Sequence, residues 1–108
     1  MRTVLTTEVF DTWFSGLRDA RAKARINARI RRAEEGNLGE AAPVGEGVSE
    51  MRIHYGPGYR VYFIQRGLSL DPDERMRSPG ELIILLAGGD KSTQAKDIKT
   101  ALEWAQQI

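Results

Sequence analysis

Five consecutive aliphatic residues near the C-terminal end of the chain constrain its fold more than any other feature: Leu82-Ile83-Ile84-Leu85-Leu86. A run of this length without an alternating polar residue suits a strand that is buried on both faces. The run continues to Ala87 and is followed by Gly88-Gly89, which we expect to end the strand. The sequence therefore predicts a fully buried strand over residues 81–87.

The segment before this run has the pattern of a β-hairpin. From Val48 the sequence changes to a period of two, which is typical of a half-buried strand. The polar members of the alternation are Glu50, Arg52 and His54. Gly56-Pro57-Gly58 then supplies a tight turn, and residues 59–64 return as the next strand.

Apolar residues spaced at i, i+3, i+4 and i+7 predict helices in the N-terminal third and at the C-terminus. The first helix spans residues 7–18 after an N-cap at Thr6 or Thr7, the second spans 20–35, and the last spans 92–107. A short strand is expected at residues 2–5. Residues 36–47 have turn composition and are expected to form a loop. The predicted order is βααβββα.

Composition limits the chain to one folded domain. Its 108 residues allow a single core, because compact domains commonly have about 100–150 residues. We therefore expect one domain over 1–108. With no cysteine, the chain has no disulfide framework, thiolate nucleophile or cysteine-bound zinc, which suits a reducing cytoplasm, and we expect no cofactor and no metal. The start has no signal-peptide pattern, and no apolar run reaches the length of a membrane span, so a soluble protein is expected.

The net charge of +1 conceals one strongly basic segment. Between Arg18 and Arg32 the chain carries seven basic residues against the single acid Asp19. Arg21, Arg25 and Arg29 recur at helical spacing, and we expect them to contact RNA. The alternative is a solvated helix exterior, which commonly has this composition. An acidic segment of a partner protein would also suit such a face.

Four ordered blocks of sequence, which cover nearly the whole chain, carry a resemblance to a known family. The blocks are Gly36-Asn37-Leu38-Gly39, Gly47-Val48-Ser49-Glu50-Met51-Arg52-Ile53, Tyr55-Gly56-Pro57-Gly58-Tyr59-Arg60-Val61-Tyr62 and Leu85-Leu86-Ala87-Gly88-Gly89-Asp90-Lys91-Ser92-Thr93-Gln94. Together they resemble the HigB-like addiction module killer toxins of the RelE/ParE superfamily. The resemblance implies an α+β fold in which two N-terminal helices pack on a small, mostly antiparallel sheet with a C-terminal helix.

The same resemblance implies a function and its partners. Members of the superfamily are toxins of type II toxin–antitoxin systems, and many cleave messenger RNA at the ribosome. The expected partners are the ribosome, messenger RNA and a cognate antitoxin, with a helix-turn-helix antitoxin encoded next to the toxin. The ParE side of the superfamily instead inhibits DNA gyrase. Three functions stay open for this chain: a metal-independent, ribosome-dependent endoribonuclease, a non-enzymatic gyrase inhibitor, and a module that only binds its antitoxin.

The resemblance transfers to individual residues unevenly. Arg60 matches the strand arginine that contacts the reacting phosphate in RelE-type toxins, and Lys91 matches a second basic residue after a glycine turn. Arg52 and His54 represent in part the basic residues of the preceding strand. Asp97 stands about where RelE-type toxins carry their catalytic tyrosine, which is a departure from the pattern. The stretch 67–80 is also longer than the usual hairpin of the family.

Metal-independent RNA cleavage requires a group that takes the proton of the ribose 2′-OH and cations that stabilise the extra charge on the phosphate. His54 is the candidate proton-transfer group, because imidazole is the side chain that ordinarily changes charge near neutral pH. Arg60 and Lys91 are the candidate catalytic cations, and Arg52 is expected to bind RNA as a phosphate contact. Tyr55 or Tyr59 could stack on a base. The alternatives are a surface histidine, an Arg60 that only pairs with Glu50 across the sheet, and tyrosines that pack in the core.

Overall fold

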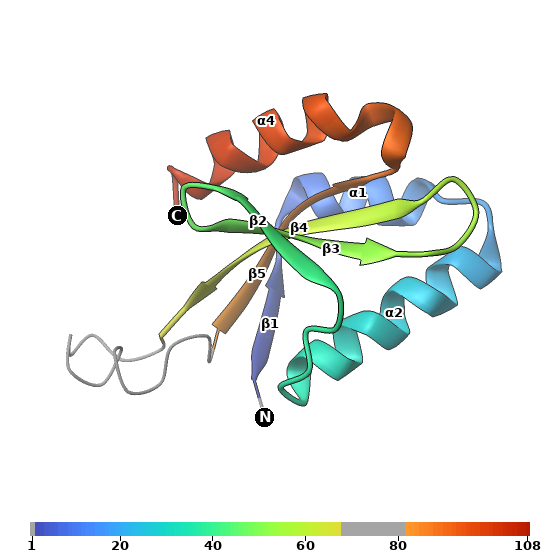
Figure 1. Ribbon diagram of the computed structural model, residues 1–108, viewed down its shortest axis with the longest axis horizontal. Coiled ribbons are helices and arrows are strands. Elements are labelled where there is room, and N and C mark those ends of the chain that lie inside the picture. The colour runs from blue at the N-terminus through green and yellow to red at the C-terminus, as the bar shows by residue number, and fades with distance from the viewer. Residues whose placement is uncertain (1, 68–81) are drawn as a thin grey trace.

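A five-stranded mixed sheet forms the centre of the fold, which is of the α+β class (Figure 1). The computed structural model describes residues 2–67 and 82–108, so nearly all of the predicted 67–80 excursion lies outside the described residues. The strands are β1 (Thr3–Thr6), β2 (Ala41–Gly45), β3 (Val48–Ile53), β4 (Tyr59–Arg66) and β5 (Leu82–Gly89). The helices are α1 (Glu8–Gly16), α2 (Ala20–Glu34), the 3-10 helix η1 (Lys91–Thr93) and α4 (Gln94–Ala105).

The strands lie in the order β1-β5-β4-β3-β2, so the aliphatic strand β5 lies between two neighbours. β5 pairs in parallel with β1 and antiparallel with β4, and the remaining pairs are antiparallel. Ile83 and Leu85 belong to one hydrophobic cluster, whereas Ile84 and Leu86 belong to another. The prediction of a strand buried on both faces is therefore confirmed, although the strand runs through Gly88-Gly89 instead of ending before them.

Helices cover both faces of the sheet. Phe10 of α1 and Ala22 and Ile26 of α2 pack with one face, and Ala101 of α4 packs with the other. In Figure 1, α4 and α2 accordingly lie on opposite sides of the strands. The core thus has two layers of side chains, one on each side of the sheet, as expected for an amphipathic helix packed on each face.

The strand β2 corrects the prediction of a loop over residues 36–47. Ala41–Gly45 pairs with β3 at the edge of the sheet, with a register shift between Pro43 and Gly45. An edge strand tolerates proline because the backbone N–H groups on its outer side form no hydrogen bonds with another strand. A turn-like composition therefore does not exclude an edge strand. The turn that follows places Glu46 and Gly47 at φ values of 51° and 82°, as a two-residue hairpin turn requires. The observed order of major elements is βααββββα.

The predicted helices are confirmed, with shifted ends. α1 begins after Thr7, whose side chain accepts a hydrogen bond from the backbone N–H of Phe10. α2 begins after Asp19, whose carboxylate accepts from the N–H groups of Arg21 and Ala22. Both are N-caps of the preferred residue types. None of the helices in the described part of the chain is long and apolar enough to cross a membrane.

Candidate functional site

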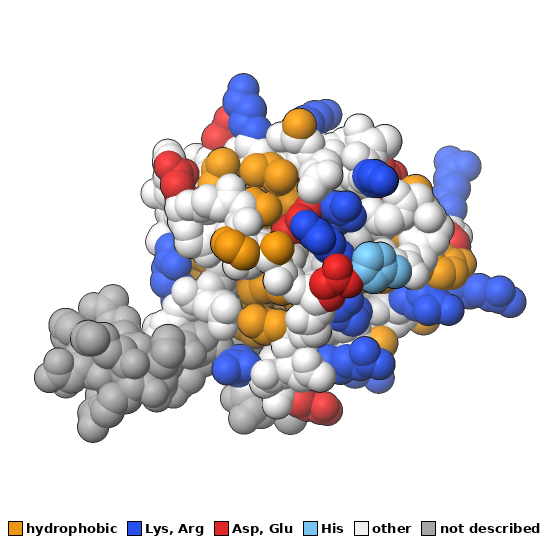
Figure 2. Space-filling view, viewed as in Figure 1, with side chains coloured by type: hydrophobic (Ala, Val, Ile, Leu, Met, Phe, Trp, Pro, Cys, Tyr) orange, Lys and Arg blue, Asp and Glu red, His pale blue; other side chains and the backbone are white. Residues whose placement is uncertain are grey.

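An open pocket of about 470 Å³ lies at the turn end of the β3–β4 hairpin. It is lined by His54, Tyr55, Gly56, Pro57, Gly58, Arg60 and Lys91. The three residues predicted to be catalytic, His54, Arg60 and Lys91, therefore surround one pocket although they come from three segments of the chain. We call this space the hairpin pocket. Figure 2 shows Lys and Arg side chains gathered around the pale-blue histidine on this face of the molecule.

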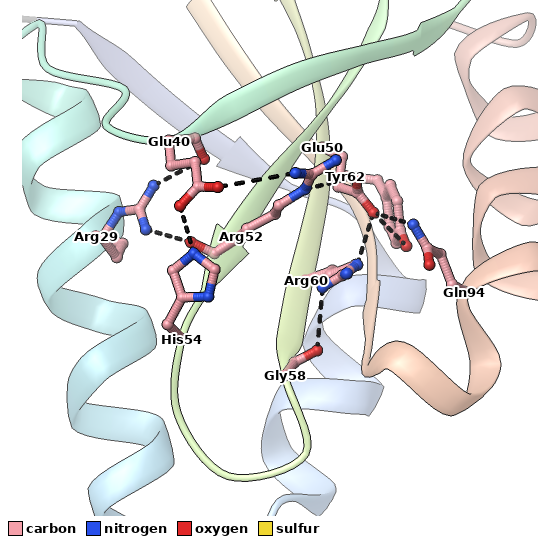
Figure 3. A network of polar contacts seen from close by, with 9 residues as sticks. All are labelled: Arg29, Glu40, Glu50, Arg52, His54, Gly58, Arg60, Tyr62 and Gln94. Atoms are coloured by element: carbon pink, nitrogen blue, oxygen red, sulfur yellow. Dashed lines mark hydrogen bonds and ion pairs between the residues drawn. The ribbon is translucent and has the colours of Figure 1, made fainter.

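Arg60 is held at the pocket by a buried carboxylate (Figure 3). Its Nε lies 2.9 Å from Oε1 of Glu50, whose side chain is only 2% exposed. The contact is an ion pair without a well-directed N–H···O hydrogen bond. Nη1 of Arg60 also donates to the carbonyl of Gly58 at 3.4 Å. The arginine side chain is only 14% exposed, so most of it is buried beside Glu50.

The register of the hairpin explains why Glu50 occupies this position. Arg52 lies directly opposite Arg60, and like charges in that arrangement repel each other. Glu50 lies opposite Tyr62, which makes it the diagonal neighbour of Arg60 and places it two residues from Arg52 on the same strand face. Its second oxygen accepts a hydrogen bond from Nε of Arg52 at 3.3 Å. One carboxylate thus offsets the repulsion between two arginines.

Two further side chains complete the surroundings of Glu50. Nε2 of Gln94, in the first turn of α4, donates to Oε1 of Glu50 at 2.7 Å. The hydroxyl of Tyr62 lies 3.4 Å from the same oxygen. Burial, and then the charge of Glu50, raise the pKa of Tyr62 far above its ordinary value, so its hydroxyl stays protonated and can donate. The buried carboxylate therefore has partners from β3, β4 and α4.

His54 lies immediately after the end of β3, and its side chain is exposed. Its Nε2 contacts a carboxylate oxygen of Glu40, which precedes β2. The hydrogen bond from His54 is the main cause that lowers the pKa of Glu40. The other oxygen of Glu40 lies 3.7 Å from Nη1 of Arg52. A neutral His54 that donates from Nε2 to Glu40 has its Nδ1 lone pair left as an acceptor.

Lys91 reaches the pocket because the segment after β5 crosses the hairpin turn. The backbone N–H of Lys91 donates to the carbonyl of Pro57 at 3.4 Å. Gly58 adopts φ +79°, and a Cβ built on it would lie 3.6 Å from Cβ of Lys91. Asp90 caps the η1 turn by accepting from the N–H of Ser92 at 2.8 Å. The turn geometry therefore places Lys91 beside the β3–β4 turn.

The glycine pair Gly88-Gly89 serves the packing of β5. A Cβ at Gly88 would lie 2.2 Å from a ring atom of Trp13, and one at Gly89 would lie 1.8 Å from Oδ2 of Asp97. Only glycine fits positions where neighbours approach so closely from both faces. Asp97 itself accepts a hydrogen bond from the hydroxyl of Thr93 and is not among the residues that line the hairpin pocket.

The structure separates the two tyrosines that could stack on RNA bases. Tyr59 is 8% exposed and its ring meets Trp13 edge-on at 6.2 Å between centroids, so the prediction that it stacks on RNA is wrong in this conformation. Tyr55 lines the hairpin pocket, but the guanidinium of Arg25 already stacks over its ring. The guanidinium carbon lies 4.7 Å from the ring centroid. The hydroxyl of Tyr55 donates to Asp19 at 3.0 Å, which lowers the pKa of Asp19 and raises the pKa of Tyr55.

The predicted RNA-binding arginines of α2 also differ from one another. Arg21 and Arg25 are exposed. Arg29 is half-buried and donates to the backbone carbonyls of Arg52, Leu38 and Glu40. Burial, and then the charge of Arg32, lower the pKa of Arg29. The prediction that Arg29 contacts RNA is therefore corrected, since its guanidinium joins α2 to the start of β2 and the end of β3.

Sequence reasoning missed three residues of this network, namely Glu40, Tyr62 and Gln94. The predicted alternative in which Arg60 pairs with Glu50 is confirmed by their ion pair. Tyr62 could have been found from its position two residues after Arg60 on β4. Glu40 and Gln94 carry no local signal, because they reach the network from segments far away in the sequence. Among the described residues, no group of three His, Asp or Glu side chains could hold a metal ion.

Comparison with known proteins gives one relative over almost the whole chain. A protein of Haemophilus influenzae is 48% identical over 105 residues, which cover 97% of this chain and 94% of the relative. The chain belongs to the family of that protein. Because the relative is described as an uncharacterized protein, it adds no activity to the chemistry of the pocket. No protein-family model and no solved structure gives a significant match.

Proposed function

We propose that this chain is the toxin of a type II toxin–antitoxin system in the HigB-like branch of the RelE/ParE superfamily, and that it cleaves messenger RNA on the ribosome. The observation that supports the proposal is the hairpin pocket, in which Arg60, Lys91 and His54 surround one open space. An arginine and a lysine beside a histidine suit the cleavage of a phosphodiester without a metal. Such an enzyme would work in the cytoplasm, where ribosomes are found.

The proposed reaction uses the ribose 2′-OH as the nucleophile. Nδ1 of His54 takes the 2′-OH proton while the 2′ oxygen forms a bond to the adjacent phosphorus. The bond from phosphorus to the 5′ oxygen breaks, and this oxygen takes a proton from a water molecule, whose hydroxide is neutralised by the proton that His54 releases to solvent. The products are a 2′,3′-cyclic phosphate and a 5′-hydroxyl end. Arg60 and Lys91 stabilise the additional negative charge that the phosphate carries during the reaction.

Two carboxylates prepare the pocket for this chemistry. Glu40 holds Nε2 of His54, which selects the neutral tautomer with Nδ1 as the proton acceptor. Glu50 forms an ion pair with Nε of Arg60, which keeps the guanidinium at the pocket. Both act through another residue, so they are positioning residues. Arg52 contacts both carboxylates and links the two positions.

The first experiment expresses the chain alone in a bacterial host and maps both messenger RNA ends and gyrase-linked DNA breaks. Endonucleolytic RNA cleavage with new 5′-hydroxyl ends is the expected result. DNA breaks without RNA cleavage would replace the proposal by gyrase inhibition, for which no proton-transfer group is needed. Absence of any toxic effect would leave only a module that binds its antitoxin.

The second experiment tests the chemical role of His54 on purified ribosomes with one defined message. His54→Gln is expected to slow single-turnover cleavage by about 10²–10⁴-fold, the usual contribution of general acid–base catalysis, while RNA binding persists. Because the side chain is exposed, the melting temperature should stay unchanged, which separates chemistry from folding. An unchanged rate would leave Arg60 and Lys91 as a purely electrostatic site.

A further inference from the structure

A second pocket, of about 310 Å³, lies between α2 and the end of β3. It is lined by Arg25, Ala28, Arg29, Arg32, Ile53 and His54. We call it the arginine pocket. Its volume lies at the lower end of the range of about 300–1,000 Å³ that is usual for ligand pockets. Three of its lining residues are arginines, and no Asp or Glu is among the lining residues that the structure describes.

The arginines of this pocket have few anionic partners of their own. Arg25 and Arg32 form no ion pair with any carboxylate in residues 2–67 and 82–108. The Nη groups of Arg29 donate to backbone carbonyls, and its Nε has no acceptor among the described residues. The charge of Arg32 also acts unfavourably on Arg29. An anion in this pocket would offset the repulsion between the cations.

The two pockets share one residue, because His54 lines both of them. A ligand that occupies both pockets must therefore carry negative charges at intervals along a chain. An RNA strand has one phosphate per nucleotide, and guanidinium groups bind phosphate in a bidentate geometry. The aromatic ring of Tyr55, which lines the hairpin pocket and contacts Arg25, provides an apolar surface between the two cationic sites.

We infer that the arginine pocket is a second phosphate subsite, which binds the RNA backbone next to the nucleotide held in the hairpin pocket. The inference rests on the proposed function and adds a binding site to it. Arg25 and Arg32 provide the cationic contacts, and Arg29 is a positioning residue that joins α2 to β3. The smallest RNA that binds fully is thus longer than a dinucleotide, since it must place one phosphate in each pocket.

The test compares Arg32→Gln with Arg31→Gln in the full chain. Both arginines are exposed on α2 and both substitutions remove one charge, but Arg31 is not among the lining residues of the arginine pocket. Binding is measured by NMR shift titration at low salt with 2′-O-methyl RNA, which lacks the attacking hydroxyl. Arg32→Gln is expected to weaken binding of a hexanucleotide roughly tenfold, as for the loss of one charged hydrogen bond. Binding of a dinucleotide should change less than about twofold, because one phosphate occupies only the hairpin pocket.

The salt dependence gives an independent readout. In Arg32→Gln the slope of log affinity against log salt concentration should become shallower by about 0.7, the value for one phosphate contact on a single strand. Equal effects of Arg32→Gln and Arg31→Gln would overturn the subsite while leaving hairpin-pocket binding intact. If the hexanucleotide shifts no signal in either pocket, the proposed function falls with it. If an oligoglutamate of matched charge competes with equal affinity and the same dependence on Arg32, the pocket binds a protein segment instead.

Discussion

Among the described residues, Glu50 is the acidic residue whose side chain is buried. Its environment explains the geometry of the hairpin pocket. A buried carboxylate is costly unless cations and hydrogen-bond donors surround it. Here Arg60, Arg52, Gln94 and Tyr62 all contact it. The same contacts hold Arg60 in one orientation, so stability and the proposed phosphate binding depend on one cluster.

We predict that Arg60→Ala destabilises the protein by about 3 kcal/mol, because it removes the closest cation from a buried carboxylate. The double variant Glu50→Gln/Arg60→Ala should recover part of this loss, since the neutral amide leaves no unpaired charge. Urea denaturation of both variants, and of Glu50→Gln alone, measures the coupling as a double-mutant cycle.

The stability of Arg60→Ala decides how the activity of Arg60 variants is interpreted. Arg60→Lys keeps the positive charge near Glu50 but loses the planar geometry that binds phosphate at two points. It is therefore the better variant for activity, whereas Arg60→Ala combines a folding effect with any effect on RNA. A free energy of unfolding for Arg60→Ala within about 0.5 kcal/mol of wild type would contradict the structural role of the pair.

At the scale of elements, Thr7 joins the start of α1 to the centre of the sheet. Its backbone N–H donates to the carbonyl of Leu85 at 3.1 Å. Its hydroxyl lies 3.0 Å and 2.9 Å from the carbonyls of Leu85 and Leu86, and it also accepts from the N–H of Phe10. The residue is 7% exposed, so water cannot readily replace these partners.

We predict that Thr7→Val lowers the free energy of unfolding by about 1–2 kcal/mol, because the isosteric side chain removes both the N-cap and a buried donor. Thr6→Val is the matched control, since Thr6 is exposed at the end of β1 and should change stability by less than about 0.5 kcal/mol. Thermal and urea unfolding check both values. Equal effects of the two substitutions would show that the hydrogen bonds of Thr7 contribute no net stability.

At the scale of the whole molecule, charge is concentrated although the net charge is only +1. The hairpin pocket and the arginine pocket meet at His54, and together they place cations from α2, β4 and η1 on one face. Figure 2 shows this concentration of blue side chains next to an apolar area. A partner that covers the face would have to bring acidic groups.

We predict that a small protein encoded next to this chain binds it and cancels its effect on growth. The complex should weaken as salt rises, because opposite charges at an exposed face are screened. Co-expression followed by affinity purification and size-exclusion chromatography at two salt concentrations tests this. If the neighbouring product neither binds nor restores growth, the toxin–antitoxin assignment is wrong whatever the RNA experiments show.

Local patterns in the sequence were sufficient for most elements. Three helices, the hairpin of β3 and β4 and the buried strand β5 follow from periods of 3.6 and 2 and from an unbroken aliphatic run, and the structure confirms them within a few residues. The turn at Gly56-Pro57-Gly58 follows from residue types that adopt tight turns, with Gly56 and Gly58 at positive φ. These features depend on neighbours in sequence, so the sequence determined them by itself.

Tertiary structure decided which residues far apart in the sequence come into contact, because local patterns carry no information on such contacts. β2 forms because Ala41–Gly45 pairs with the backbone N–H and C=O groups at the edge of β3. The position of β2 brings Glu40 to His54. Tyr59 is buried because α1 supplies Trp13 above it. A periodic pattern shows which side chains share a face, but the strand order and the crossing of helices determine which distant residue meets that face. For this reason the sequence determined the elements and the candidate cations, whereas their carboxylate partners depended on the fold.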